Sequence, residues 1–267
     1  MKEKAYIFDV DGTITPACGI IDNEFQKEFV EFASNNICYL ITGSDRQKTY
    51  GQVGPEVYDV CKQVYQCNGA EVWEQNRRVK TSAWTPPHEL KSHLKNIAHH
   101  SRCPVKTNNF IEIRTGMVNF STVGRNCTPD QRKQYYQWDQ MSQERTYLAR
   151  NIEKKFDDLN AVVGGQISID IYPKGQNKSL IANDLKDEYE LVFFGDKTMH
   201  GGNDYPLAMM IELGNLGKTH QVDGWESTRQ ILREVVSRRY TKSNPNIEKT
   251  IIRHMDKLMS QTTRIIP

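Results

Sequence analysis

Short apolar runs that end at polar turns recur along this chain and constrain its fold most. They read AYIFDV, ICYLITGSD, VYQCNGAE and ELVFFGDKT, and their aromatic and β-branched residues are typical of buried parallel strands. After Asp22, which can cap a helix, Phe25, Phe29, Phe32 and Ala33 have the spacing of one helix face. Alternation of strands and helices predicts a doubly wound α/β sheet, whose ligand site lies at the carboxyl ends of the strands.

The middle of the chain has a different hydrophobic pattern. NFIEIRTGMVNFSTVGR and AVVGGQISIDIYP are long alternating stretches typical of antiparallel strands, and TPDQRKQYYQWDQ and RTYLARNIEKKF read as helices. Thr128, Pro129 and Gln131 form a capping-box start for the first helix. We therefore predict an α+β cap domain inserted into a parallel-sheet core. The predicted limits are core 1–81, cap 82–173, core 174–236 and a basic helical extension 237–267.

Composition bounds the class of protein. The 267 residues suffice for two modest domains, and no segment approaches the ~18 apolar residues of a membrane-spanning helix. The start MKEKAYIFDV lacks the apolar stretch of a secretion signal. Six cysteines occur without a C-x-x-C pair, which favours reduced thiols. These features predict a cytoplasmic protein with no membrane partner.

The C-terminal residues carry a local excess of positive charge. Residues 237–267 hold seven Lys/Arg against Glu248 and Asp256, so this segment is +5 within a chain of net charge +2. Ile247, Ile251, Ile252, Met255 and Leu258 form an apolar stripe, which is more often a docking face than a cofactor site. Without interleaved aromatic residues or a recognisable motif, we expect the basic side chains to be solvated and nucleic-acid binding to be unlikely.

Two aspartates follow the first apolar run, in the string D-V-D-G-T-I-T. Asp9 and Asp11 would repel each other at a strand end unless they share a hard cation such as Mg²⁺, which prefers oxygen ligands. One carboxylate can then attack phosphorus, and its neighbour can serve as general acid and base. The alternative is an ordinary Asp-rich turn without chemistry.

Three further polar residues follow the predicted strands or open a helix. Ser44 follows the second run, Lys178 opens a helix, and Asp196 follows the last run. This order resembles the haloacid dehalogenase superfamily of phosphotransferases. The resemblance implies that Asp9 is the nucleophile, Asp11 the acid/base, and Ser44 and Lys178 phosphate ligands. It also implies a metal site, for which we expect Asp9, Asp11 and Asp196.

Longer strings resemble one family within that superfamily. FIEIRTGMVNFSTVGRNCTPDQR, GGQISIDIYP and FFGDKTMHGGND are similar to segments of the eukaryotic-type phosphomannomutases, in order over roughly residues 5–230. The resemblance implies a cap that closes over a sugar phosphate, a Mg²⁺ requirement and homodimers formed through the caps. We also expect activation by a hexose 1,6-bisphosphate.

The cap supplies the expected substrate ligands. Arg114, Arg125 and Arg132 come from a strand, a strand end and the first turn of a helix, and a guanidinium fork holds phosphate in a bidentate manner. In the resembled family the matching arginines hold the phosphate that is not transferred. The positions matching Ser168 and Asp170 bind sugar hydroxyls.

The chain departs from the family pattern in two places that bear on function. Cys18 stands where the family usually has a substrate-binding arginine. After GGND, this chain reads YPLAMMIELGN in place of an acidic loop associated with a further cation.

We expect a Mg²⁺-dependent phosphomannomutase that works through an aspartyl phosphate. A phosphatase acting on sugar phosphates or nucleotides is the alternative enzyme, and a catalytically weak scaffold is the alternative of another class. The preferred hexose is left open, because sugar epimers differ by one hydroxyl.

Overall fold

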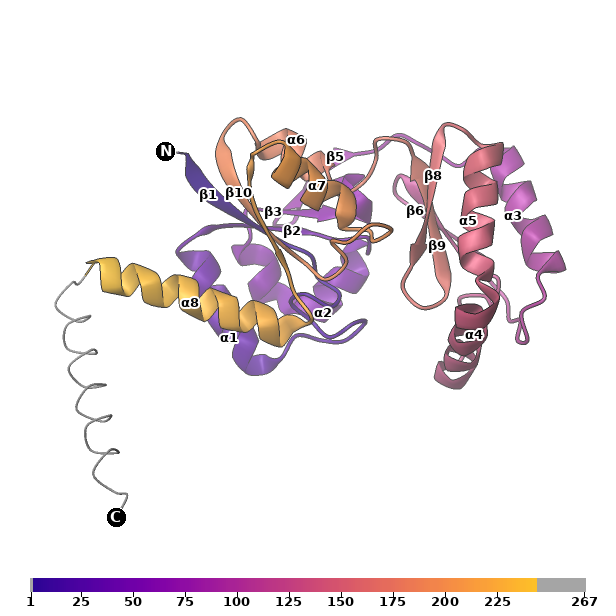
Figure 1. Ribbon diagram of the computed structural model, residues 1–267, viewed down its shortest axis with the longest axis horizontal. Helices are drawn as coiled ribbons and strands as arrows, with labels where there is room; N and C mark the ends of the chain where they lie inside the picture. Colours follow the sequence, from indigo (N-terminus) through magenta and orange to yellow (C-terminus); the bar gives the residue numbers. More distant parts are fainter. Residues whose placement is uncertain (1, 244–267) are drawn as a thin grey trace, which may run out of the picture.

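The computed structural model describes residues 2–243, which form an α/β core and a smaller α+β cap (Figure 1). The core sheet has the order β11-β10-β1-β2-β3-β4-β5. Its strands are β1 (Glu3–Phe8), β2 (Ile37–Ile41), β3 (Gln63–Gln66), β4 (Glu71–Glu74), β5 (Arg77–Thr81), β10 (Tyr189–Gly195) and β11 (Gly217–Gln221). The five strands from β11 to β3 are parallel, and β4 and β5 add an antiparallel edge. The predicted α/β class with a parallel core is confirmed.

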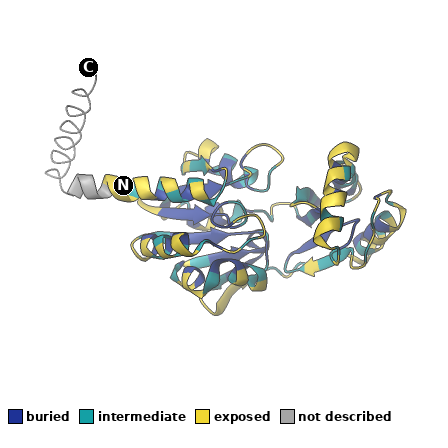
Figure 2. Ribbon diagram, turned by 90° about the horizontal axis from the view of Figure 1, so that it is seen from below, coloured by how far each residue is buried: buried dark blue, intermediate teal, exposed yellow. Residues whose placement is uncertain are grey.

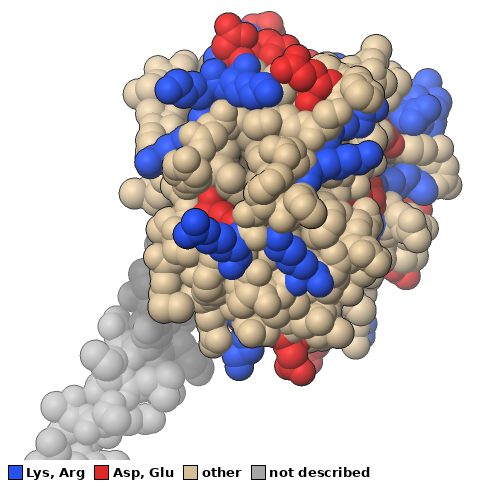
Figure 3. All heavy atoms as spheres, turned by 90° about the vertical axis from the view of Figure 1, so that its right-hand side faces the viewer, with Lys and Arg blue, Asp and Glu red and all other residues tan. Residues whose placement is uncertain are grey.

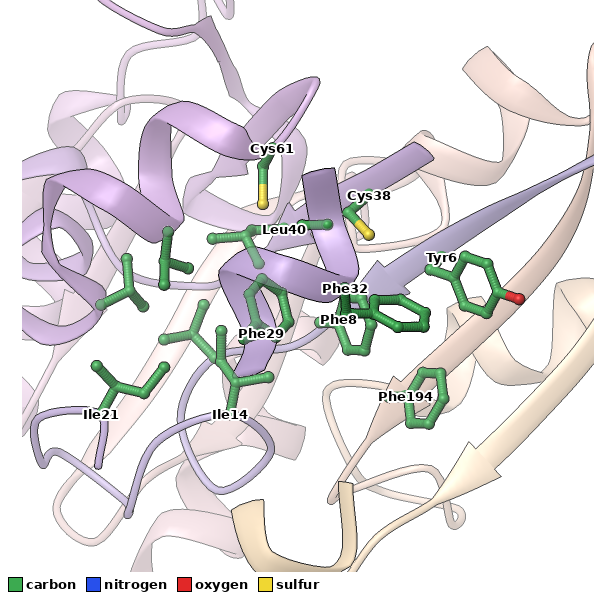
Figure 4. Close-up of a cluster of buried hydrophobic side chains, with 14 of the residues drawn as sticks. Tyr6, Phe8, Ile14, Ile21, Phe29, Phe32, Cys38, Leu40, Cys61 and Phe194 are labelled. Atoms are coloured by element: carbon green, nitrogen blue, oxygen red, sulfur yellow. The ribbon is translucent and has the colours of Figure 1, made fainter. Parts of the chain in front are cut away.

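Helices cover both faces of this sheet. They are α1 (Asn23–Ser34), α2 (Arg46–Val60), α6 (Leu180–Leu185), α7 (Tyr205–Leu213) and α8 (Trp225–Ser243), with a short 3₁₀ turn, η1, at Cys67–Gly69. Phe8 and Phe194 of the sheet pack with Phe29 of α1 on one face (Figure 4). On the other face, Ile7 packs in a cluster with residues of α6 and α7. The sheet is therefore buried on both sides, as its continuous apolar strands require.

The local start signals of two helices act as the sequence predicts. Asp22 caps α1 by accepting hydrogen bonds from the backbone N–H groups of Glu24 and Phe25. Thr128 and Gln131 form the reciprocal capping box at the start of α4 (Pro129–Ser142). In α1 the buried residues are Phe25, Phe29, Phe32 and Ala33, the predicted apolar face.

The cap has an antiparallel sheet of order β6-β7-β9-β8. Its strands are β6 (Ile111–Arg114), β7 (Met117–Phe120), β8 (Leu159–Gly164) and β9 (Ser168–Pro173), and its helices are α3 (His88–His100), α4 and α5 (Glu144–Lys155). Figure 2 shows buried residues concentrated in the core sheet and between the cap sheet and its helices. All cap elements lie between β5 and α6 in the chain, which accords with an inserted domain; the exact limits 82 and 173 stay predictions.

The C-terminal prediction is only partly covered by the structure. Helix α8 extends through residues 237–243, and the rest of the predicted extension lies outside the described residues. Within residues 2–243, no helix combines the length and apolar character that crossing a membrane requires.

Candidate active site

Adjacent parallel strands bring Asp9 and Asp196 to one edge of the core sheet. Strands β1 and β10 pair in register, with Phe8 opposite Phe194, so the residue after each strand projects at the same end. The backbone N–H of Asp9 donates to the carbonyl of Phe194 at 2.9 Å. The predicted convergence of these two acids thus follows directly from the strand order.

Lys178 lies between two buried carboxylates at this edge. Its Nζ donates to Asp9 Oδ1 at 2.5 Å and to Asp204 Oδ1 at 2.7 Å, and the Lys178 side chain is fully buried. Asp204 also accepts a hydrogen bond from the backbone N–H of Lys197 at 3.0 Å. Because a lone buried charge is costly, the ammonium and its two carboxylates stabilise one another.

Asp9, Asp196 and Asp204 form a group that fits a divalent cation. One carboxylate oxygen from each lies within 4.8 Å of the others. Asp196 Oδ1 is buried without a hydrogen-bond partner among the described residues, which leaves an oxygen available to a ligand. Carboxylate oxygens are the donors that Mg²⁺ takes. Asp204 was not predicted, although an acid in the glycine-rich loop GGND after β10 was a visible signal.

Glycines allow these acids to approach so closely. A Cβ on Gly12 would lie 2.7 Å from Asp196 Oδ2, and Gly12 has φ +82°. A Cβ on Gly195 would lie 2.8 Å from Asp204 Oδ2. The D-x-D-G turn therefore needs glycine both for its left-handed backbone and for the space beside Asp196.

The Asp11 carboxylate lies outside this acidic group. It accepts hydrogen bonds at 2.8 Å from Lys48 Nζ, Gln52 Nε2 and the backbone N–H of Cys18. Lys48 and Gln52 are four residues apart on α2 and so share one helix face. These donors hold the Asp11 side chain in a second polar group, while Asp204 joins Asp9 and Asp196. The expected role of Asp11 as a metal ligand stays a prediction.

The surroundings shift the pKa values of Asp9 and Asp11 in opposite directions. Burial raises the pKa of Asp9 to about 7 against the opposing Lys178 ammonium, and the carboxylates of Asp204 and Asp196 add to the rise. Burial also acts to raise the pKa of Asp11, but the Lys48 ammonium and the hydrogen bonds to this carboxylate hold that pKa below its usual value. The Lys48 ammonium and these hydrogen bonds therefore favour the ionised form of Asp11.

Mg²⁺ is expected to stabilise the protein more at pH 8 than at pH 6. The pKa of Asp9, about 7, is raised from 3.8, so the metal-free fold loses stability as pH rises through 7. At pH 6, displacing the Asp9 proton weakens metal binding about tenfold. Thermal unfolding with Mg²⁺ or with NaCl of equal ionic strength measures this, and equal Mg²⁺-dependent shifts at both pH values would contradict it.

Ser44 lies beside Asp11 in the loop between β2 and α2. It is buried, and its Oγ accepts from Lys48 Nζ at 2.9 Å and donates to Asp11 Oδ2 at 3.4 Å. Its backbone N–H donates to Thr42 Oγ1 at 3.1 Å. Ser44, Lys48 and Asp11 therefore form one polar group next to the Asp9 cluster.

Two of the three predicted cap arginines share one carboxylate. Arg114 Nε and Arg125 Nε donate to the two oxygens of Glu112, at 2.6 Å and 2.8 Å. Arg114 Nη1 also donates at 3.2 Å to the carbonyl of Gly43, beside Ser44. Glu112 was not predicted from the sequence, and it brings both guanidinium groups together, with Arg114 also contacting the core.

The other predicted cap residues lie on β9 and α4. Asp170 accepts from Asn119 Nδ2 at 2.6 Å, and burial raises the pKa of Asp170 against the opposing charge of Arg114. Ser168 is buried, and its Oγ donates to the carbonyl of Gly164 at 3.0 Å. The half-buried Arg132 side chain has no hydrogen bond or ion pair within residues 2–243. The structure thus places Arg114, Arg125 and Asp170 near one another, and the Arg132 side chain is available to a ligand.

The two departures from the family pattern have clear structural places. Cys18 is exposed, has φ +59°, and contributes its backbone N–H to Asp11. The segment YPLAMMIEL forms α7. Among residues 2–243, the group of three or more acidic, His or Cys side chains that could hold a metal is the one around Asp9, and the expected loss of a further cation site stays a prediction.

The core with its cap has the fold of capped haloacid dehalogenase-like proteins. A haloacid dehalogenase-like hydrolase from Bacteroides thetaiotaomicron aligns with TM-score 0.55 at 12% identity, covering 88% of this chain and 100% of that chain. The sequence profile described as eukaryotic phosphomannomutase matches residues 25–238. The chain therefore belongs to the eukaryotic phosphomannomutase family, as its long motifs predicted.

Curated relatives agree with this membership. The phosphomannomutase of Saccharomyces cerevisiae is 31% identical over 243 residues, which are 87% of this chain and 94% of that protein. The phosphomannomutase of Spinacia oleracea is 33% identical over 210 residues, which are 75% of this chain and 84% of that protein. The similarity thus spans both the core and the cap.

Proposed function

We propose that this protein is a Mg²⁺-dependent phosphomannomutase that interconverts mannose 6-phosphate and mannose 1-phosphate. The observation that carries the proposal is the position of Asp9, which lies between Lys178 and the acidic group in a chain of this family. A divalent cation held by Asp9, Asp196 and Asp204 would neutralise the repulsion between these carboxylates and the incoming phosphate.

In the proposed reaction, phospho-Asp9 and a hexose monophosphate exchange a phosphoryl group. Asp11 takes the proton of the sugar hydroxyl, the hydroxyl oxygen bonds to phosphorus, and the bond from phosphorus to the Asp9 carboxylate breaks. The ionised state of Asp11 suits this first role. The product is a hexose bisphosphate and a free Asp9 carboxylate.

The bisphosphate then re-enters the site with its other phosphate toward Asp9. The Asp9 carboxylate attacks that phosphorus, and Asp11 returns its proton to the departing sugar oxygen. Lys178 fixes Asp9 Oδ1, so Asp9 Oδ2 is the oxygen left for attack. A hexose 1,6-bisphosphate would prime the cycle by phosphorylating Asp9.

The cap would hold the substrate by the phosphate that is not transferred. Arg114, Arg125 and Arg132 supply guanidinium forks, and Ser168 and Asp170 supply groups for sugar hydroxyls. The bond from Arg114 to Gly43 supports a cap that closes onto the core beside Ser44. Closure would exclude water from the acyl phosphate.

Hydrolysis is the second candidate activity, favoured by one specific feature. Cys18 supplies no guanidinium at a position where the family usually has arginine, so one contact with the substrate is lost. A substrate that is held less firmly lets water reach phospho-Asp9 more often. We therefore expect slow phosphate release beside the mutase reaction. The intact Asp9, Asp11, Lys178 and Asp196 disfavour a scaffold without activity.

We further propose a cytoplasmic homodimer formed through the caps. Tyr136, Met141 and Tyr147 are exposed apolar residues of α4 and α5, with Met141 81% exposed. Figure 3 shows that residues other than Lys, Arg, Asp and Glu cover most of this end of the molecule. The six cysteines are free thiols, which suits a reducing compartment. Light scattering across a concentration series tests the dimer.

A substrate panel tests the proposed activity. Turnover with Mg²⁺ is compared on mannose 1-phosphate, glucose 1-phosphate and nucleotides, each with and without a hexose 1,6-bisphosphate. Isomerisation of a hexose phosphate that needs the bisphosphate supports a mutase. Hydrolysis of nucleotides as the fastest reaction would replace the proposal with a nucleotidase.

Arg132→Lys is expected to impair hexose phosphate turnover far more than hydrolysis of a small phosphoester. The small ester has no second phosphate to anchor, whereas the hexose bisphosphate needs a planar fork that a lysine point charge cannot replace. Steady-state kinetics on mannose 1-phosphate and methyl phosphate measure the difference. The matched control is Lys133→Arg on the exposed side of α4. Equal losses on both substrates would refute the role of Arg132.

A further inference from the structure

The inner face of the cap sheet carries a row of polar side chains. Helices α3 and α5 cover the outer face, where Val118 and Phe120 join their apolar cluster, and the inner face is turned toward the core (Figure 1). Strand pairing places Glu112 opposite Asn119 and Asn119 opposite Asp170. Because residues that pair across neighbouring strands lie on the same face of a sheet, Glu112 shares the face of Asp170.

Glu112 contacts the two arginines in the same way. Arg114 and Arg125 each donate through Nε, and each donates to a different oxygen of the Glu112 carboxylate. The side chains of Arg114 and Arg125 are only 11% and 23% exposed. Burial acts to raise the pKa of Glu112, but the hydrogen bonds and charges of both arginines hold that pKa below its usual value. Charge-assisted bonds of this kind, shielded from solvent, fix the two guanidinium groups relative to each other.

The two arginines differ in the atoms that remain for a ligand. Within residues 2–243, Arg125 makes no hydrogen bond through Nη1 or Nη2, so this edge of its guanidinium can hold a phosphate in a bidentate manner. Arg114 Nη1 donates to the carbonyl of Gly43 in the core, which leaves Nη2 for a ligand. Arg125 is therefore placed to supply the phosphate fork, and Arg114 is placed to join that fork to the core.

We propose that Glu112 is a positioning residue that holds Arg114 and Arg125 as one clamp for the phosphate that is not transferred. This inference rests on the proposed function, in which the cap holds that phosphate. Without the carboxylate, the two neighbouring guanidinium groups would repel each other, and their long side chains would occupy several rotamers. Glu112 would thus strengthen substrate binding without touching the substrate, because the clamp is formed before the substrate arrives.

Steady-state kinetics of the full chain, with Mg²⁺ and a hexose 1,6-bisphosphate, test this role. Glu112→Gln keeps the size of the side chain but removes its charge and one of the two Nε acceptors. We expect a roughly tenfold higher KM for mannose 1-phosphate with a much smaller change in kcat, since the clamp binds this phosphate alike before and during transfer. Hydrolysis of methyl phosphate, which offers the clamp no second phosphate, is expected to change far less. Glu112→Asp keeps both oxygens and is expected to recover part of the loss.

The matched control is Glu89→Gln on α3, which removes the charge of an exposed carboxylate that pairs with Lys155 at 3.5 Å. Its KM for mannose 1-phosphate is expected to equal that of the wild type. A lower KM in Glu112→Gln would show that Glu112 competes with the substrate phosphate, and an unchanged KM would show that the arginines do not need it; either result overturns the proposal.

Two further outcomes would also overturn the proposal, and they differ in what else they refute. Equal losses on mannose 1-phosphate and methyl phosphate, together with a lower melting temperature of Glu112→Gln, would assign Glu112 a purely structural role and leave the proposed function standing. Absence of hexose phosphate turnover in the wild type would refute the proposed function itself, and that result needs no variant.

Discussion

Asp9→Asn is expected to lower mutase and phosphatase turnover by several orders of magnitude while the fold is kept. The amide has the size of the carboxylate but cannot attack phosphorus, and it weakens the oxygen cluster shared with Asp196 and Asp204. Lys178 keeps its bond to Asp204, so the buried ammonium is not left alone. Phosphate release and isomerisation assays measure the loss, and circular dichroism checks the fold.

The matched control for this variant is Asp59→Asn, on the exposed side of α2. It changes the net charge by the same amount and touches no residue of the site. Wild-type turnover is expected for the control. Substantial turnover in a well-folded Asp9→Asn protein would place the nucleophile on another residue.

Lys178→Met is expected to abolish turnover and also to destabilise the fold. Removing the ammonium leaves two buried carboxylates, Asp9 and Asp204, without a cation in metal-free protein. Removing one partner of a buried ion pair costs about 3–5 kcal/mol. Urea unfolding in EDTA measures the free energy of unfolding, and turnover with Mg²⁺ measures activity.

Two controls separate this effect from a general loss of charge. Lys4→Met breaks an exposed pair with Glu190, 3.6 Å long, and exposed pairs contribute only about 0–1 kcal/mol. Adding Asp204→Asn to Lys178→Met removes one of the unpaired charges, so stability is expected to recover in part while activity does not. An unchanged urea midpoint for Lys178→Met would contradict the role of the buried ammonium.

The core could be predicted because its strands are short, apolar and bounded by polar turns. A parallel sheet places the ends of neighbouring strands together, so Asp9 and Asp196 could be placed at one edge without coordinates. The same holds for α1, whose four apolar residues and capping aspartate define one buried face. In the core, the apolar pattern of each segment therefore agrees with the position of that segment in the folded sheet.

The partners of these residues could not be predicted, because they depend on tertiary distances. Lys48 and Gln52 look like ordinary polar residues of an amphipathic helix until α2 brings them within 2.8 Å of Asp11. Glu112 lies on β6, two residues before Arg114. Only the folded structure brings Arg114 and Arg125 to its two oxygens. Asp204 reaches the site through a glycine-rich loop, whose path has no periodic signal.

The most direct test of the central claim follows mannose 1-phosphate by phosphorus NMR in the presence of Mg²⁺, with and without a hexose 1,6-bisphosphate. A mutase that regenerates phospho-Asp9 predicts mannose 6-phosphate as the main product, formed faster with the bisphosphate, and inorganic phosphate as a slower product. Accumulation of inorganic phosphate with no 6-phosphate under either condition would contradict the mutase account and establish a phosphatase in its place.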